Sequence, residues 1–144
     1  MHPIPKALEI QIEISRWSCV KRRPDQSIDF IAPLPCPFNY GSVRGRAAPD
    51  GDPEDALVLG NRVEALSVVR MPVWGRIVFV DAGVEDHKWV CGRTPPSESE
   101  WKALEKFFQV YALSKRFLYF FRRTRGEVNF LGVERFAVER SSSR

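Results

Sequence analysis

The sequence predicts an α+β domain in which a small β-barrel is covered by helix. Three observations support this fold class: alternating apolar residues near the N-terminus, many short strand-like runs before Gly92, and one long helical pattern that begins after Pro95-Pro96. A chain of 144 residues is expected to form a single domain, residues 1–144, with flexible ends at residues 1–7 and 141–144.

The N-terminal third is predicted to contain strands and a proline-rich loop. Residues 8–15 alternate between apolar and polar side chains, which is the pattern of a half-buried strand. Short strands are expected near residues 18–22 and 27–31. Three prolines at alternate positions then interrupt regular structure, so an extended loop over residues 33–37 is expected to lead to Phe38-Asn39-Tyr40-Gly41.

Two acidic turns divide the middle of the chain. The first is Asp50-Gly51-Asp52-Pro53-Glu54-Asp55, where Gly51 and Pro53 favour a sharp turn. The second covers residues 81–88 and contains Asp81 and Asp86. The strands expected around these turns cover residues 56–59, 66–74, 75–80 and 89–91.

A helix is predicted after Pro95-Pro96. Ser97 and Glu100 have the spacing of a capping box, in which each side chain bonds a free backbone N–H of the first turn. Apolar residues then recur at helical spacing, and the helix is expected to run through Phe121. A late strand over residues 126–130 and a short last helix over residues 133–139 complete the prediction.

Composition excludes several classes of protein. No apolar run is long enough for a transmembrane helix, and the N-terminus lacks the apolar segment of a signal peptide, so the expected location is cytoplasmic, with no membrane partner. Three cysteines without Cys-x-x-Cys spacing indicate reduced thiols. Two histidines argue against a histidine-rich metal site and against a nucleophile–histidine mechanism.

The first acidic turn is the strongest functional signal. Asp50, Asp52 and Asp55 lie within six residues, and carboxylates crowded so closely favour a hard divalent cation such as Mg²⁺. An exposed loop has the same composition, so the solvated turn is the alternative. A helix-loop-helix calcium site is excluded because its sixth and twelfth positions, which need Gly and Glu, hold Asp55 and Asn61.

These motifs together resemble the soluble, Mg²⁺-dependent inorganic pyrophosphatases of family I, from about residue 8 to residue 137. The resemblance rests on Asn39-Tyr40-Gly41 followed by the acidic turn and residues 56–58, on Asp81 followed by Asp86-His87-Lys88, and on Phe107-Phe108-x-x-Tyr111. It implies a closed, antiparallel, five-stranded OB-like barrel with one long and one short C-terminal helix packed outside. It also implies a homo-oligomer.

The resemblance implies a metal site that holds two or more Mg²⁺ ions. Asp50, Asp55 and Asp86 resemble ligands of the tightest metal, and Asp55 resembles the bridge to a second one. Asp81 and Asp86 resemble ligands of a metal that arrives with the substrate, and Glu13 resembles part of a further metal site. A water shared by two metals would be the nucleophile.

The remaining functional residues follow from the same resemblance. Asp52 resembles the carboxylate that takes a proton from the nucleophilic water. Lys21, Tyr40, Lys88 and Tyr111 resemble groups that bind phosphate oxygens. The implied reaction is Mg²⁺-dependent hydrolysis of pyrophosphate to two orthophosphates.

Departures from the family pattern affect mainly the binding of substrate. Arg23 replaces a glutamate, Phe30 an arginine, Cys36 a tyrosine, Ala82 an acidic residue and Ala112 a lysine. An arginine at position 23 could meet phosphate in place of a glutamate-bound metal, or it could simply face water.

These departures leave alternatives to an active pyrophosphatase. The chain could be a weakened or inactive relative that binds metal and phosphate, or a hydrolase of another phosphoanhydride. The basic group Arg122, Arg123 and Arg125 could cover the site, contact another subunit, or do neither. Nucleic-acid binding is disfavoured by the acidic turns, despite a formal net charge of +4.

Overall fold

The computed structural model describes residues 4–23, 25–31, 36–49, 51–122 and 126–136, which form nine strands and one helix. The expected loop over residues 33–37 and the expected tail over residues 141–144 lie largely or wholly outside this range. The strands are β1 (Ala7–Ile14), β2 (Val20–Arg22), β3 (Ile28–Ile31), β4 (Asn39–Ala47), β5 (Pro53–Val58), β6 (Val68–Asp81), β7 (Val84–Glu85), β8 (Lys88–Cys91) and β9 (Asn129–Arg135), and the helix is α1 (Glu98–Arg122).

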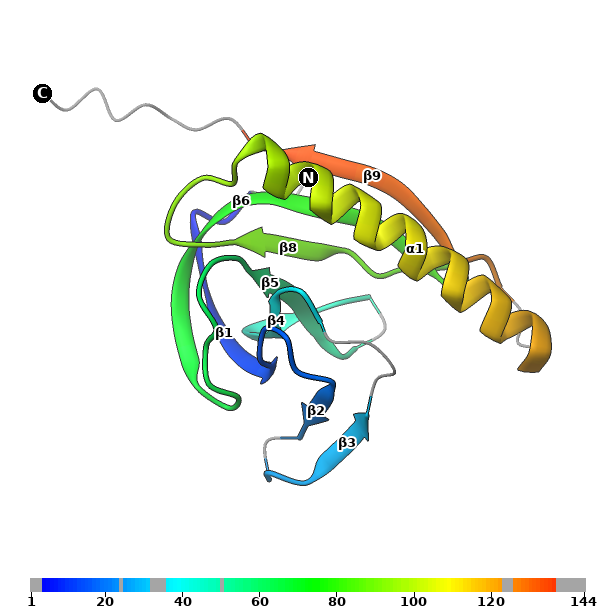
Figure 1. Cartoon of the computed structure of the whole chain (residues 1–144), viewed down its shortest axis with the longest axis horizontal. Helices are drawn as coiled ribbons and strands as arrows, with labels where there is room; N and C mark the ends of the chain where they lie inside the picture. Colours follow the sequence, from blue (N-terminus) through cyan, green and yellow to red (C-terminus); the bar gives the residue numbers. More distant parts are fainter. Residues whose placement is uncertain (1–3, 24, 32–35, 50, 123–125, 137–144) are drawn as a thin grey trace, which may run out of the picture.

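Five strands close into a barrel in the order β1-β4-β5-β8-β6, because β6 pairs back onto β1. The pair β5–β8 is parallel and the other barrel pairs are antiparallel, so the barrel is mixed, whereas a purely antiparallel one was predicted. β7 and β9 add to β6, and β2 and β3 form a separate hairpin. The predicted fold class, a small barrel with helical cover, is confirmed (Figure 1).

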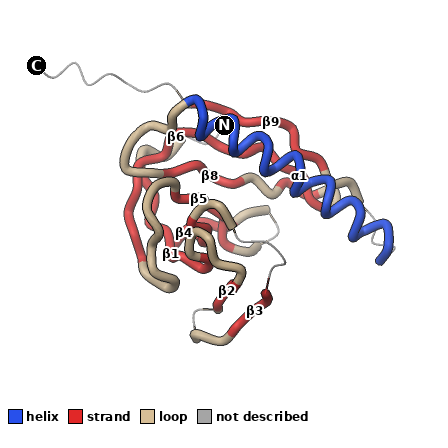
Figure 2. Tube along the Cα trace, in the orientation of Figure 1, coloured by secondary structure: helices blue, strands red, loops and turns tan. Residues whose placement is uncertain are grey.

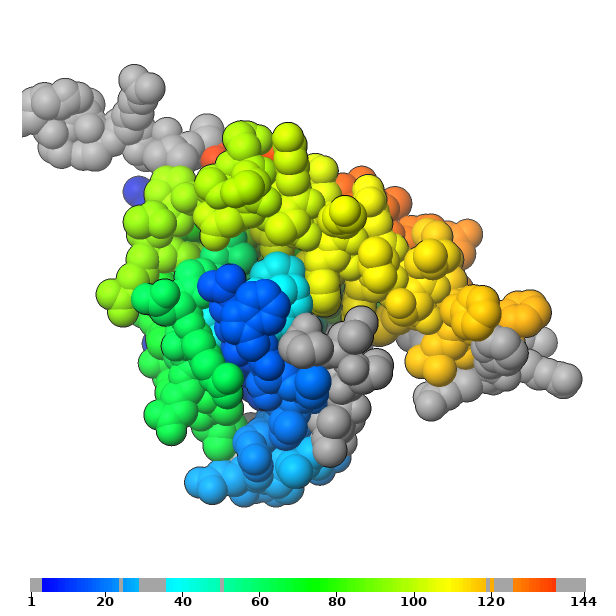
Figure 3. Space-filling view, in the orientation of Figure 1, coloured from blue at the N-terminus to red at the C-terminus, as the bar shows by residue number. Residues whose placement is uncertain are grey.

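The helix begins as the sequence predicted. The backbone N–H of Ser97 donates to the Glu100 carboxylate at 3.0 Å, and the N–H of Glu100 donates to the Ser97 hydroxyl at 3.2 Å, which is a complete capping box. α1 then lies across the barrel, and its C-terminal end extends past the strands (Figure 2). In the space-filling view α1 forms a ridge over one side, and the β2–β3 hairpin projects on the other (Figure 3).

Two apolar clusters hold the fold together. One is built from alternate residues of β1, β5, β6 and β8, and includes Ile10 and Ile12, both fully buried. The other joins the opposite faces of β5, β6 and β8 to α1 through Leu104 and Phe108. Alternate residues of a strand point to opposite faces, so each central strand contributes to both clusters. Lys88 and Asp55 lie on the same strand faces as residues of the second cluster, to which α1 also contributes.

The structure differs from the predicted elements at the following places. Residues 66–74 and 75–80 are parts of one strand, β6, which contains a register shift between Val73 and Gly75. β4 was not predicted at all. The predicted last helix over residues 133–139 is wrong where it is described: residues up to Arg135 belong to β9, which pairs with β6 from Gly75 to Val80.

Gly41 is required by the closure of the barrel. A Cβ atom at this position would lie 2.1 Å from the backbone oxygen of Gln11 on the neighbouring strand β1. We therefore expect Gly41→Ala to lower the free energy of unfolding by about 3 kcal/mol, since overpacking of this kind displaces backbone. Denaturant titration checks this, with Gly92→Ala as the control, because its added Cβ would approach nothing closer than 3.5 Å. Equal unfolding midpoints for the two variants would contradict the prediction.

Across the described residues, no helix combines the length and apolar character that crossing a membrane requires. The three cysteines, Cys19, Cys36 and Cys91, are free, as the sequence predicted.

Candidate active site

Asn39 fixes the beginning of β4. Its side chain is fully buried and makes four hydrogen bonds, all with backbone groups: it accepts from Arg16 N and Val63 N, and it donates to Val58 O and Asn61 O. Two donors and two acceptors are the whole capacity of an amide side chain. The adjacent Tyr40 is therefore held in one position at the edge of the barrel.

Lys88 is the centre of a first polar group, defined by Tyr40, Asp55, Asp86 and Lys88 and here called the Lys88 group. The Lys88 side chain is 2% exposed, and its Nζ lies 3.3 Å from Asp55 Oδ2 and 3.0 Å from Asp86 Oδ2. Asp55 and Lys88 are direct neighbours in the parallel pair β5–β8. The Tyr40 hydroxyl donates a hydrogen bond to the Asp55 carboxylate.

Burial controls the acidity of this group. It raises the pKa of Asp55 above its ordinary value, although the Lys88 ammonium acts in the opposite direction. Burial, followed by the nearby Asp55 carboxylate, raises the pKa of Tyr40 well above its ordinary value. Tyr40 is therefore a neutral hydrogen-bond donor at neutral pH.

The segment that carries Asp86 is held by the backbone of β6. The N–H of Asp86 donates to Phe79 O at 2.9 Å, and the N–H of Phe79 donates to His87 Nδ1 at 3.1 Å. His87 thus supports the position of Asp86 and Lys88. Burial, followed by the nearby Arg76 guanidinium, lowers the pKa of His87 below its ordinary value, so the ring is neutral at neutral pH.

A second polar group consists of Asp81, Tyr111 and Lys115 and is here called the Lys115 group. Lys115 Nζ pairs with Asp81 Oδ2 and also donates to the Tyr111 hydroxyl. It lies 5.3 Å from the centre of the Tyr111 ring. Burial alone would lower the pKa of Lys115, but Tyr111 and Asp81 outweigh it, and the pKa lies above its ordinary value.

Aromatic rings connect the two groups. The Phe79 ring lies 5.7 Å from Lys88 Nζ and 5.5 Å from the Tyr111 ring. Tyr40 lies close enough to Tyr111 and Asp86 for both to raise its pKa further, after burial and Asp55. The two groups therefore lie close to one another, and the Phe79 ring is near both of them.

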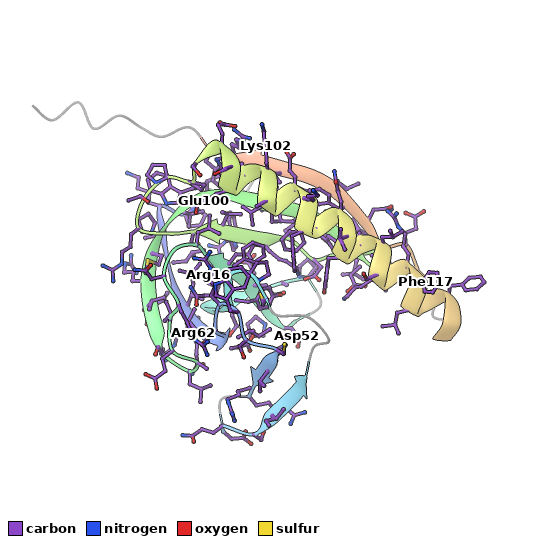
Figure 4. All side chains as sticks on the ribbon, in the orientation of Figure 1. Arg16, Asp52, Arg62, Glu100, Lys102 and Phe117 are labelled. Atoms are coloured by element: carbon purple, nitrogen blue, oxygen red, sulfur yellow. The ribbon has the colours of Figure 1, made fainter. Side chains whose placement is uncertain are left out.

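Other predicted residues come from neighbouring elements. Asp52 is exposed in the turn before β5, Lys21 lies on β2, and Glu13 is the extra residue of a β-bulge where β1 pairs with β4. Bulges commonly redirect a side chain beside an active site. Asp50 lies outside the described residues. Figure 4 shows Asp52 between the barrel and the β2–β3 hairpin, away from Phe117 near the end of α1.

The structure bears on two of the departures from the family pattern, those at Arg23 and Ala112. Arg23 bonds within the β2–β3 hairpin, donating to Ser27 Oγ and Ile28 O, each at 3.4 Å. Ala112 stands where the family pattern has a lysine. Lys115, which was not identified from the sequence, supplies an ammonium group near Tyr111 instead. Helical spacing could have found it, because residues four apart share a helix face.

Two carboxylates of the site are oxygen donors of the kind that a hard divalent cation takes. Within the part of the chain that the structure describes, no group of three or more acidic, histidine or cysteine side chains lies close enough together to hold a metal ion. Asp55 and Asp86 nevertheless converge on one Lys88 ammonium, so two carboxylates already face a bound positive charge. Oxygen donors of this kind are the ligands that Mg²⁺ prefers. Asp55 and Asp86 therefore supply two ligands of the type that the metal implied by the family resemblance takes.

Comparison with known proteins gives a consistent result. A family model described as inorganic pyrophosphatase matches residues 3–134. An inorganic pyrophosphatase of Gluconobacter oxydans is 34% identical over 96 residues, which cover 61% of this chain and 56% of the relative. One of Sulfolobus acidocaldarius is 30% identical over 128 residues, covering 81% of this chain and 73% of the relative. The chain thus spans little more than half the length of the first of these relatives.

A solved structure shows the same fold. The inorganic pyrophosphatase of Helicobacter pylori superposes with a TM-score of 0.72 over 90% of this chain and 85% of its own, at 24% identity. At this identity the likeness shows the fold alone.

Proposed function

The chain belongs to the inorganic pyrophosphatase family, and we propose that it hydrolyses inorganic pyrophosphate to two orthophosphates with Mg²⁺ as its cofactor. The observation that carries the proposal is the Lys88 group, in which a buried ammonium is held between two carboxylates beside Tyr40. Such a group offers acidic oxygens to a cation and an ammonium to an anion at the same place. A metal–phosphate substrate needs both.

Five acidic residues would hold the metal ions, two or more at the site: Asp50, Asp55, Asp81, Asp86 and Glu13. Bound Mg²⁺ lowers the pKa of water far below its value of about 15.7 and offsets the charge of the phosphates. Burial raises the pKa of Asp55 and so disfavours its charged form, and a cation bound beside it would favour the charged form and offset that cost.

The other residues act on the substrate and on the attacking water. Asp52 would accept a proton from that water as it attacks one phosphorus, and the other phosphate leaves. Lys88, Lys21, Tyr40 and Tyr111 would bind phosphate oxygens and stabilise the charge that moves to the leaving group. Tyr40 can do so as a donor because it stays protonated at neutral pH.

Phosphate release from pyrophosphate tests the proposal. We expect the wild-type protein to release two phosphates per pyrophosphate with Mg²⁺ present and none after chelation. Asp52→Asn is expected to lower the rate about a hundredfold, since it removes one proton acceptor. Glu105→Gln, an exposed change on α1, is the matched control and should keep full activity. Activity that survives chelation, or that Asp52→Asn leaves unchanged, would contradict the mechanism.

A weakened relative is the second candidate, and the contact of Lys115 with Asp81 favours it. This ammonium occupies a carboxylate that is expected to bind metal. Saturable Mg²⁺ binding without phosphate release in the same assay would support this candidate. Release of phosphate from a different phosphoanhydride, with pyrophosphate untouched, would instead indicate altered substrate specificity.

A further inference from the structure

Lys115 differs from Lys88 in how firmly it is held. Lys88 is 2% exposed and touches two carboxylates, whereas the Lys115 side chain is 25% exposed and contacts one carboxylate, that of Asp81 (17% exposed), and the neutral Tyr111 hydroxyl. Lys115 projects from α1, while Asp81 is the last residue of β6. The pair therefore joins the helix to the barrel across the site, and a lysine side chain with several rotatable bonds can leave it without moving the backbone.

Asp81 faces one ammonium for one carboxylate, which makes it a poorer metal ligand than Asp55 and Asp86, two carboxylates that share the single ammonium of Lys88. The charge of Asp81 is already balanced, so a divalent cation that binds there must displace the ammonium or share the oxygens with it. A phosphate group in the same region changes this balance. It carries more negative charge than one carboxylate and presents several acceptor oxygens, so the Lys115 ammonium has a competing partner within reach.

We propose that Lys115 is an internal counter-ion of Asp81, which keeps a divalent cation off this carboxylate until a phosphate group attracts the lysine away. Lys115 is thus a positioning residue that makes metal binding at Asp81 depend on phosphate binding. The inference rests on the proposed function, because it concerns the order in which metal and substrate occupy that site. Linkage requires the converse as well: a cation on Asp81 strengthens phosphate binding.

Calorimetric titration with Mg²⁺, in the absence of any phosphate, tests the inference directly. Lys115→Met keeps the length of the side chain and removes the charge. We expect this variant to bind one Mg²⁺ about tenfold more tightly than the wild type, the scale of a typical coupling between two sites. Inorganic phosphate should tighten Mg²⁺ binding to the wild type and have a much smaller effect on Lys115→Met.

Three further variants make the result specific. Lys106→Met, an exposed change on the same helix, should leave Mg²⁺ binding as in the wild type. Lys115→Arg retains the positive charge and should also behave as the wild type. In an Asp81→Asn background the Lys115→Met change should have no effect on Mg²⁺ affinity, because the carboxylate that the lysine protects is gone.

The inference is overturned if Lys115→Met binds Mg²⁺ no more tightly than the wild type, or if its gain persists in the Asp81→Asn background. Pyrophosphate hydrolysis is measured on the same samples. Absence of hydrolysis together with the expected pattern of Mg²⁺ affinities would contradict the proposed function and leave the role of Lys115 intact.

Discussion

Lys88→Met is expected to abolish hydrolysis and to destabilise the metal-free protein. The variant leaves Asp55 and Asp86 facing each other in a partly buried site without the ammonium that lies 3.3 Å and 3.0 Å from them. Removing one partner of a buried ion pair costs about 3–5 kcal/mol, chiefly because the remaining charges are uncompensated. The loss of a fixed cation beside the phosphates is expected to lower kcat about a thousandfold.

Denaturant unfolding with and without Mg²⁺ separates the two effects of Lys88→Met. Mg²⁺ should restore much of the lost stability, because a divalent cation can take the place of the ammonium between the carboxylates and binds only the folded state. The hydrolysis rate should remain low at saturating Mg²⁺. Lys102→Met, an exposed change on α1 (Figure 4), is the control and should alter neither quantity. An unfolding free energy within 1 kcal/mol of the wild-type value, roughly the effect of an ordinary surface change, would contradict the expectation.

Elements with a strong local pattern could be predicted from the sequence. β1 alternates in hydrophobicity, and α1 has both a capping box and a regular apolar spacing, so their types follow from residues close together in the chain. The two short strands β2 and β3 were also predicted, although their pairing with each other was not. In these segments the preference of the residues for a strand or a helix agrees with the structure that they adopt in the folded protein.

Elements defined by distant pairing could not be predicted in this way. β4 contains glycine, serine and two arginines and has little strand propensity of its own, but β1 and β5 pair with it on both sides. Gly75 looked like a boundary between strands. It instead lies inside β6, where the Trp101 ring would come within 2.6 Å of any Cβ atom.

The same reasoning applies to the site. The acidic turns and Lys88 were found from the sequence, yet only the parallel pairing of β5 with β8 makes Asp55 and Lys88 direct neighbours. No local pattern encodes that register. Lys115 was missed because the family resemblance directed attention to the position directly after Tyr111, whereas the helix presents the lysine one turn later.

Asp55→Asn is expected to separate activity from stability. The asparagine keeps an oxygen that can accept the Tyr40 hydrogen bond, and Lys88 keeps Asp86 as a partner. It removes a negative charge from the proposed metal site, so we expect Mg²⁺ affinity to fall and hydrolysis to drop at least about a thousandfold. Calorimetric Mg²⁺ titration and phosphate release measure the two effects.

The metal-free Asp55→Asn protein should be at least as stable as the wild type at neutral pH. Burial raises the pKa of Asp55 from 3.8, so the folded state holds this proton more tightly than the unfolded state does. The contribution of Asp55 to stability therefore falls as pH rises from about 3.8 through the raised pKa, and above it the ionised carboxylate is a net cost. Asparagine carries no such cost.

The difference in stability between Asp55→Asn and the wild type should accordingly depend on pH. It should be largest above the raised pKa of Asp55 and should vanish as pH falls below 3.8, where the carboxyl group becomes protonated in both states. Adding Mg²⁺ at neutral pH should reverse the order, since the wild type gains binding energy that the variant lacks. If the metal-free variant were less stable than the wild type, the main role of the Asp55 carboxylate would be its ion pair with Lys88 and not metal binding. If the metal-free variant is instead at least as stable as the wild type, the Asp55 carboxylate lowers stability and serves the cation that it binds.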